Sequence, residues 1–74
     1  MTITQLKKRL ALQYEIKTTV RDDDDVVISL FNKRNSDFVA CFTICGDIIY
    51  NFKYIGSFEE LKHLVALLEE YQDA

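Results

Sequence analysis

The chain of 74 residues contains no proline and no tryptophan, and it has only two glycines, two cysteines and one histidine. With two glycines it has no glycine-rich loop for phosphate groups and no flexible linker. One histidine provides no metal-binding cluster, and the spacing of Cys41 and Cys45 differs from that of the common zinc and redox cysteine pairs. We therefore expect a single domain over residues 1–74, without a metal or other cofactor.

A disulfide is also excluded by spacing. Cys41 and Cys45 fall four residues apart in a segment that reads as a strand, so they would lie roughly 13 Å apart, about twice the Cα distance that a disulfide tolerates. Two thiols without a disulfide favour a reducing compartment. No apolar run is long enough to span a membrane, and the opening MTITQLKKRL lacks the apolar segment of a signal peptide. These features predict a cytoplasmic protein with no membrane contact.

Apolar periodicity predicts two helices that enclose four strands. Thr2 with Gln5, and Ser57 with Glu60, have the spacing of capping boxes, which mark helix starts. The predicted elements are a helix over residues 3–14, the strands YEIKTTVR, VVISLF, FVACFTI and IIYNFKYI, and a helix in FEELKHLVALLEEYQ. The sequence therefore predicts an α+β fold of order α-β-β-β-β-α, a four-stranded antiparallel meander with the N- and C-terminal helices packed on one face.

The connection at Gly46-Asp47 decides which side chains share a face of this sheet. A two-residue turn would separate Phe42 from Tyr50, whereas a three-residue bulged turn groups one coherent core face: Phe38, Ala40, Phe42, Ile44, Ile48, Tyr50, Phe52 and Tyr54. We therefore expect a bulged turn. The opposite face is then unusually apolar, and such a surface commonly marks a contact with a partner or a second copy. The predicted contact residues are Val27, Phe31, Val39, Cys41, Ile49 and Ile55.

The run RDDDD, residues 21–25, raises the question of a site or a turn. A calcium loop of the EF-hand type needs spaced ligands, a glycine and a glutamate at its twelfth position, and the run has none of these. Aspartate suits a turn between strands, yet four of them crowd like charge. We interpret that excess as an acidic surface that steers a basic partner, because carboxylates and phosphates pair with Lys and Arg alike. Its predicted residues are Asp22, Asp23, Asp24, Asp25, Glu59 and Glu60.

Catalysis is not expected, because no nucleophile, base and orienting group stand in a recognisable arrangement. Binding to nucleic acid is an alternative, since positive charge concentrates in the first 21 residues, at Lys7, Lys8, Arg9, Lys17 and Arg21. Double-stranded-RNA-binding domains have a similar order of elements. They begin their last helix with lysines, however, where this chain reads SFEELKHL and would repel phosphate. We therefore rank nucleic acid below a protein partner.

A short opening helix TITQLKKRL, an acidic connection RDDDD and an acidic closing helix combine in a small chain of net charge −3. In these features the chain resembles the small inhibitor proteins that phages and other mobile elements encode against host machinery, anti-CRISPR proteins included. The resemblance implies a non-enzymatic inhibitor or regulator of a nucleic-acid-handling host protein. The alternatives are the nucleic-acid-binding module, and a homodimer or complex subunit built through the sheet face.

Overall fold

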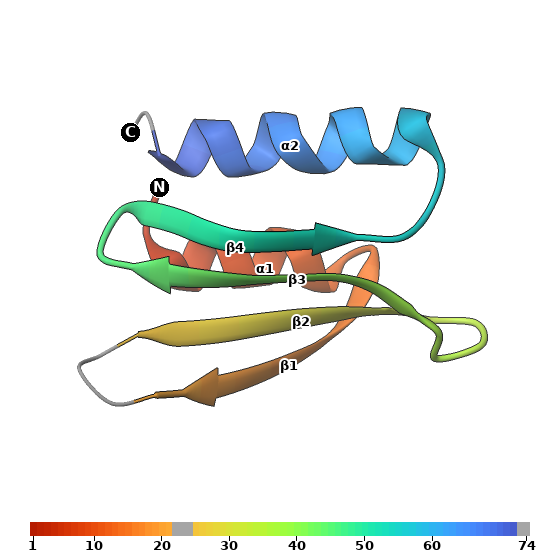
Figure 1. The fold of residues 1–74 in the computed structure, drawn as a ribbon, viewed down its shortest axis with the longest axis horizontal. Coiled ribbons are helices and arrows are strands. Elements are labelled where there is room, and N and C mark those ends of the chain that lie inside the picture. Colours follow the sequence, from red (N-terminus) through yellow and green to blue (C-terminus); the bar gives the residue numbers. More distant parts are fainter. Residues whose placement is uncertain (22–24, 73–74) are drawn as a thin grey trace.

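The computed structural model describes residues 1–21 and 25–72 and confirms the predicted order of elements (Figure 1). The fold is α+β, with two helices and a four-stranded antiparallel sheet. The elements are α1 (Ile3–Ala11), β1 (Tyr14–Val20), β2 (Val26–Asn32), β3 (Phe38–Cys45), β4 (Ile48–Tyr54) and α2 (Phe58–Gln72). Neither described helix combines the length and the apolar character that crossing a membrane requires.

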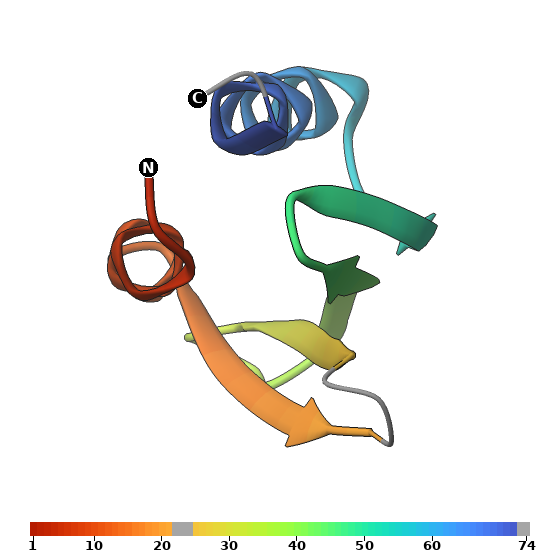
Figure 2. The ribbon, with the colours of Figure 1, turned by 90° about the vertical axis from the view of Figure 1, so that its left-hand side faces the viewer.

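The strands form an open meander of order β1-β2-β3-β4, so β1 and β4 are its two edges. Figure 2 shows α1 and α2 on the same side of the twisted sheet, as predicted. Between them and the sheet lies one core. Its buried side chains come from α1 (Leu6, Leu10), the strands (Tyr14, Ile28, Leu30, Val39, Ala40, Phe42, Ile44) and α2 (Leu64, Leu68, Tyr71). We call the side of the sheet that faces the helices the inner face and the opposite side the outer face.

Both helices begin at the predicted caps, but the first one ends earlier than predicted. Thr2 Oγ1 accepts from the Gln5 N–H and Gln5 Oε1 accepts from the Thr2 N–H, which completes the capping box. The helix stops at Ala11 rather than at residue 14. Tyr14 has the helical spacing of an apolar stripe, but it begins β1 instead, and its ring is buried there.

The turn between β3 and β4 has two residues, so the predicted bulged turn is wrong. Cys45 pairs with Ile48 across Gly46-Asp47. The extra residue occurs farther along β4, where the register shifts between the Thr43–Tyr50 and Cys41–Lys53 pairs and Asn51 has a left-handed φ of 56°. Asparagine tolerates that conformation better than most residues, which favours the bulge at this position.

The position of the bulge changes which β4 side chains meet the core. Phe52 and Tyr54 lie on the inner face as predicted, and the ring of Phe52 stacks on Phe42 with centroids 6.2 Å apart. Before the bulge, the side chains of β4 alternate between the two faces in the opposite sense to the prediction. Ile49 therefore packs against the core, while Ile48 and Tyr50, which were predicted for the core face, lie on the outer face.

Candidate protein-binding surface

Three exposed or half-buried apolar side chains gather at one end of the outer face, which we call the phenylalanine end: Phe31, Phe38 and Ile55. A register shift in β3 pairs Phe31 with Phe38, and their rings meet edge to face with centroids 6.1 Å apart. Ile55 joins this row through its N–H, which donates to the Val39 carbonyl, and its side chain is 69% exposed. No described helix covers this side of the sheet, so these side chains stay accessible.

The middle of the outer face is polar. One row crosses all four strands and runs through Lys17, Ser29, Cys41 and Lys53. The Ser29 hydroxyl donates to Cys41 Sγ at 3.7 Å, which orders the centre of the row, and the two lysines stand exposed on the edge strands. Beside this row lies a shallow hollow of about 340 Å³ whose rim includes Arg21 and Lys53. The outer face is therefore less apolar than the sequence predicted.

The other end of the outer face is acidic and aromatic, and we call it the tyrosine end: Asp25, Ile48 and Tyr50. The Tyr50 hydroxyl donates to Asp25 Oδ2 at 2.6 Å. This hydrogen bond lowers the pKa of Asp25, with a smaller contribution from Cys45, and it raises the pKa of Tyr50. The Arg21 N–H donates to the Asp25 carbonyl, which fixes the backbone where the aspartate run ends. The Asp25 carboxylate is thus held at the hydroxyl group of the exposed Tyr50 side chain.

The predicted apolar contact residues are distributed unequally. Ile55 is exposed, and Val27, Phe31 and Cys41 are half-buried on the outer face. Val39 is only 6% exposed, which leaves little of it for a partner to touch. Ile49 lies on the inner face, because the bulge is in β4 and not in the turn.

The predicted acidic residues do not form one surface. Asp22, Asp23 and Asp24 lie outside the described residues. Asp25 is beside Val26, at the end of the sheet opposite to the start of α2, where Glu59 and Glu60 lie (Figure 1). Glu59 pairs with Lys62 at 3.4 Å on the exposed side of α2.

The Glu60 side chain makes its hydrogen bonds within the fold. Its carboxylate accepts from the Tyr14 hydroxyl at 2.9 Å and from the Tyr54 hydroxyl at 3.4 Å. Burial, followed by the hydrogen bond to Glu60, raises the pKa of Tyr14, and burial together with the charge of Glu60 raises the pKa of Tyr54. Ser57 Oγ accepts from the Glu60 N–H as the capping box requires. The half-buried carboxylate binds β1 and β4 to the start of α2 and is poorly placed for a partner.

The predicted basic residues lie on two sides of the molecule. Lys7, Lys8 and Arg9 belong to α1, which packs on the inner face, and Arg9 pairs with Glu70 of α2 at 3.1 Å. Lys17 and Arg21 point to the outer face, since they alternate with Ile16 and Thr18 of β1. A single backbone of nucleic acid would not contact both groups in the way the sequence suggested.

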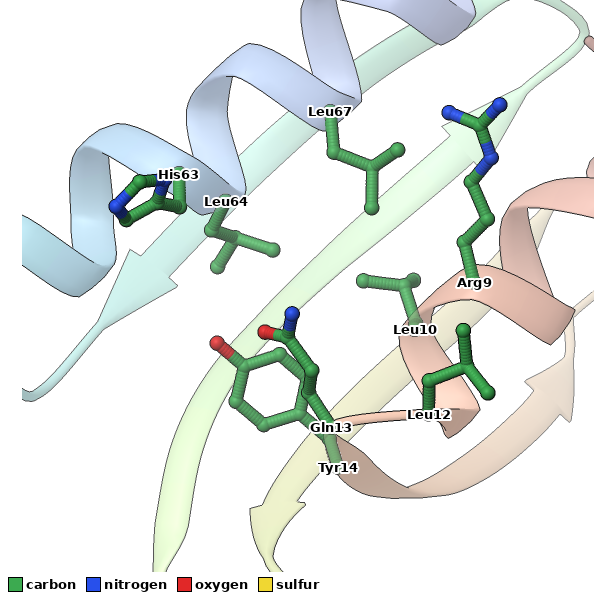
Figure 3. A pocket seen from close by; sticks show the side chains of 8 residues that line it. All are labelled: Arg9, Leu10, Leu12, Gln13, Tyr14, His63, Leu64 and Leu67. Carbon is green, nitrogen blue, oxygen red and sulfur yellow. The ribbon is translucent and has the colours of Figure 1, made fainter.

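A pocket of about 380 Å³ opens between the two helices (Figure 3). Leu64 and Leu67 of α2 face Leu10 of α1 across it, and Arg9 and His63 contribute polar groups. No local sequence pattern predicts this pocket, because its walls come from α1, the start of β1 and α2. Among the described residues, no cluster of three His, Cys, Asp or Glu side chains is arranged to hold a metal ion.

Sequence reasoning missed Phe38, Ile48 and Tyr50 as outer-face residues. Two register shifts place them there, and a strand that is read by strict alternation does not reveal such shifts. A partial signal existed in Asn51, a residue that is rare inside strands and common where the backbone adopts left-handed angles. Comparisons of the chain with protein-family models, with curated proteins and with solved structures find no match.

Proposed function

We propose that the chain is a non-enzymatic protein-binding module whose outer face contacts a host protein that handles nucleic acids, and that it regulates or inhibits that protein. The observation that carries the proposal is the Tyr50–Asp25 hydrogen bond, because it joins the acidic connection to the outer face. One partner can therefore meet Asp25 and the exposed Tyr50 side chain at the same time.

The chemistry of the two ends supports this use of the surface. Tyr50 is 37% exposed and Phe38 is 36% exposed, and aromatic side chains of this kind supply much of the energy of protein interfaces. Asp25 is negatively charged at neutral pH, and the aspartate run adjoins it in sequence. A partner surface with Lys or Arg opposite the tyrosine end and an apolar patch opposite the phenylalanine end would match this arrangement.

The test compares the wild type with one variant on the proposed surface and one matched variant elsewhere. Ile55→Lys places a charge at the phenylalanine end, whereas Leu12→Lys places the same charge on an exposed leucine at the end of α1, with 78% exposure. Each tagged protein is used to capture partners from the source cells, and the captured proteins are quantified by mass spectrometry. The proposal expects a protein that binds the wild type and L12K but not I55K. It is wrong if both variants retain or both lose the same partners.

Electrostatic steering is tested on the partner so identified. Asp25→Asn should slow association and reduce its dependence on salt, while dissociation changes less. Equal association rates for D25N and the wild type at low salt would remove Asp25 from the contact.

Binding of nucleic acid is the second candidate, favoured by Arg21 and Lys53 at the rim of the hollow on the outer face, with Lys17 exposed on the same face. An anisotropy titration with single-stranded and double-stranded DNA and RNA at low salt tests it. Tight binding that weakens steeply with salt, and that Lys53→Glu abolishes, would favour this candidate over a protein partner.

A further inference from the structure

Besides its outer face, the sheet has a second feature that no described element covers, which is the free edge of strand β1. In Figure 1 it is the outermost strand, next to β2 alone. The Arg21 N–H donates to the Asp25 carbonyl, so Arg21 directs its backbone groups to the side of β2, and in an antiparallel ladder every second residue does the same. Residues 15, 17 and 19 therefore direct their backbone groups to β2. The N–H and C=O groups of Tyr14, Ile16, Thr18 and Val20 point outward, and within residues 1–21 and 25–72 they have no assigned partner.

The two edges of the sheet differ in how well they can accept another strand. The bulge at Asn51 interrupts β4, and a regular partner strand cannot continue past it. β1 pairs with β2 over its whole length without a shift and contains no proline or glycine. Val20 leaves an apolar side chain 68% exposed on this strand. β1 is thus an uninterrupted edge with an uncovered apolar residue, a feature that proteins normally avoid unless another strand covers it.

We propose that a second copy of this chain covers the edge, with the two β1 strands antiparallel about a two-fold axis at Thr18, so that two sheets join into one. Charge disfavours a register centred on Lys17, and the exposed Val20 favours Thr18 over Ile16 as the centre, because of the two only the Thr18 register covers Val20 with an apolar side chain of β1. Centring the pair on Lys17 would place the two lysines directly opposite each other, which is unfavourable. Centring it on Thr18 places Glu15 opposite Arg21 of the second copy, a pair of opposite charge. It also places Ile16 opposite Val20 of the second copy.

The same register also gives hydrogen-bond partners to the outward backbone groups of β1. Thr18 pairs with Thr18 of the second copy, and Ile16 pairs with Val20 in both directions, so that the outward N–H and C=O groups of these residues meet each other. Glu15, Lys17 and Arg21 fall at the positions between these bonds, where opposing side chains approach most closely. The contact uses an edge of the sheet and leaves the outer face open, so it is independent of the proposed function.

The first test distinguishes the backbone hydrogen bond of Thr18 from the contribution of its side chain. Thr18→Pro removes an outward N–H that β2 does not use, and proline is tolerated at such an edge position. Thr18→Ala keeps the N–H. Sedimentation equilibrium of the full chain, from about 20 μM to about 1 mM, should show a dimer for the wild type and T18A. For T18P the dissociation constant should rise at least about tenfold, while circular dichroism shows an intact fold. A wild-type monomer at the highest concentration overturns the proposal, as does a folded T18P that dimerises like T18A.

The second test fixes the register by exchanging charges. At low salt, Glu15→Arg and Arg21→Glu should each weaken the dimer by roughly fivefold or more, because each places like charges opposite each other in both halves of the contact. The double variant E15R/R21E should recover the wild-type constant to within about threefold. Lys17→Glu is the control, since Lys17 faces Thr19 and should leave dimerisation intact. Weakening by K17E without weakening by R21E would overturn the Thr18 register.

Discussion

Gly56 offers the sharpest test of how β4 is joined to α2. A Cβ atom added at this position would lie 2.5 Å from the Tyr54 hydroxyl oxygen and 2.8 Å from Cζ of the same ring. The ring is held in this position because its hydroxyl donates to the Ser57 carbonyl at 2.9 Å and approaches Glu60 at 3.4 Å. Gly56→Ala must therefore displace the Tyr54 ring and break these contacts.

The expected cost follows from three contributions. Loss of the shared hydrogen bond of Tyr54 lowers the free energy of unfolding by about 1 kcal/mol. Displacing a packed ring adds about 1–3 kcal/mol. Replacing glycine restricts the unfolded chain by about 0.4–1 kcal/mol, but the φ of 158° at Gly56 strains a residue with a Cβ atom by at least as much, so this third contribution brings no gain. The net loss of about 2–4 kcal/mol is a large part of the total for a domain of this size, roughly 4–11 kcal/mol.

Urea denaturation of a double-mutant cycle measures this coupling. Tyr54→Phe removes the oxygen that the new methyl group would meet first, so G56A should cost at least about 1 kcal/mol less in the Y54F background. Gly46→Ala is the control, because a Cβ there meets nothing within 4 Å and only its left-handed φ of 64° opposes the change. G46A should be additive with Y54F. Equal costs of G56A in the two backgrounds would refute the assigned contact.

Substitutions at three further positions test other parts of the fold. Asn51→Val should lower the free energy of unfolding by about 1–3 kcal/mol, because a β-branched residue is strained in a left-handed conformation. Asn51→Gly should be neutral or stabilising in the same thermal melts. Equal costs of the two substitutions would contradict the bulge. Tyr14→Phe should cost about 1–2 kcal/mol in urea, because it leaves the half-buried Glu60 without its shorter hydrogen bond. Tyr50→Phe should raise the pKa of Asp25 towards its ordinary value in an NMR titration. The bond stabilises the fold above the unfolded pKa, and this contribution disappears as pH falls through the folded value, so Y50F should be less sensitive to acid in that range.

The order and type of the elements could be predicted from the sequence because each depends on local signals. The Thr2–Gln5 capping box and the alternation of β1 are such signals, and both are present in the structure. The end of the first helix was predicted wrongly because Tyr14 fits a helical stripe and a strand equally well by spacing. Tertiary contacts distinguish the two, such as the pairing of Tyr14 with Asn32 and its part-buried hydrogen bond to Glu60, 46 residues away, which no local pattern contains.

The outer-face contact surface could likewise be predicted only in part from local patterns. Grouping apolar residues predicted one extra residue in the turn, whereas the structure has it within β4. Hydrophobicity alone does not distinguish a bulge in the turn from one in the strand. The conformation of Asn51 makes that choice. The pairing of acidic residues depends on tertiary contacts, so Glu60 could not be separated from Asp25 by composition.

The bulge also connects the fold to the proposed function. With the extra residue in the turn, Tyr50 would have joined the core face, and no aromatic hydroxyl would have reached Asp25. With the bulge at Asn51, Phe52 and Tyr54 still complete the core, while Tyr50 lies on the outer face and holds the carboxylate. A core alone requires only that the apolar residues of β4 face inward. Because this strand changes its alternation midway, it supplies side chains to the core and to the exposed surface, and that division is what makes the tyrosine end available to a partner.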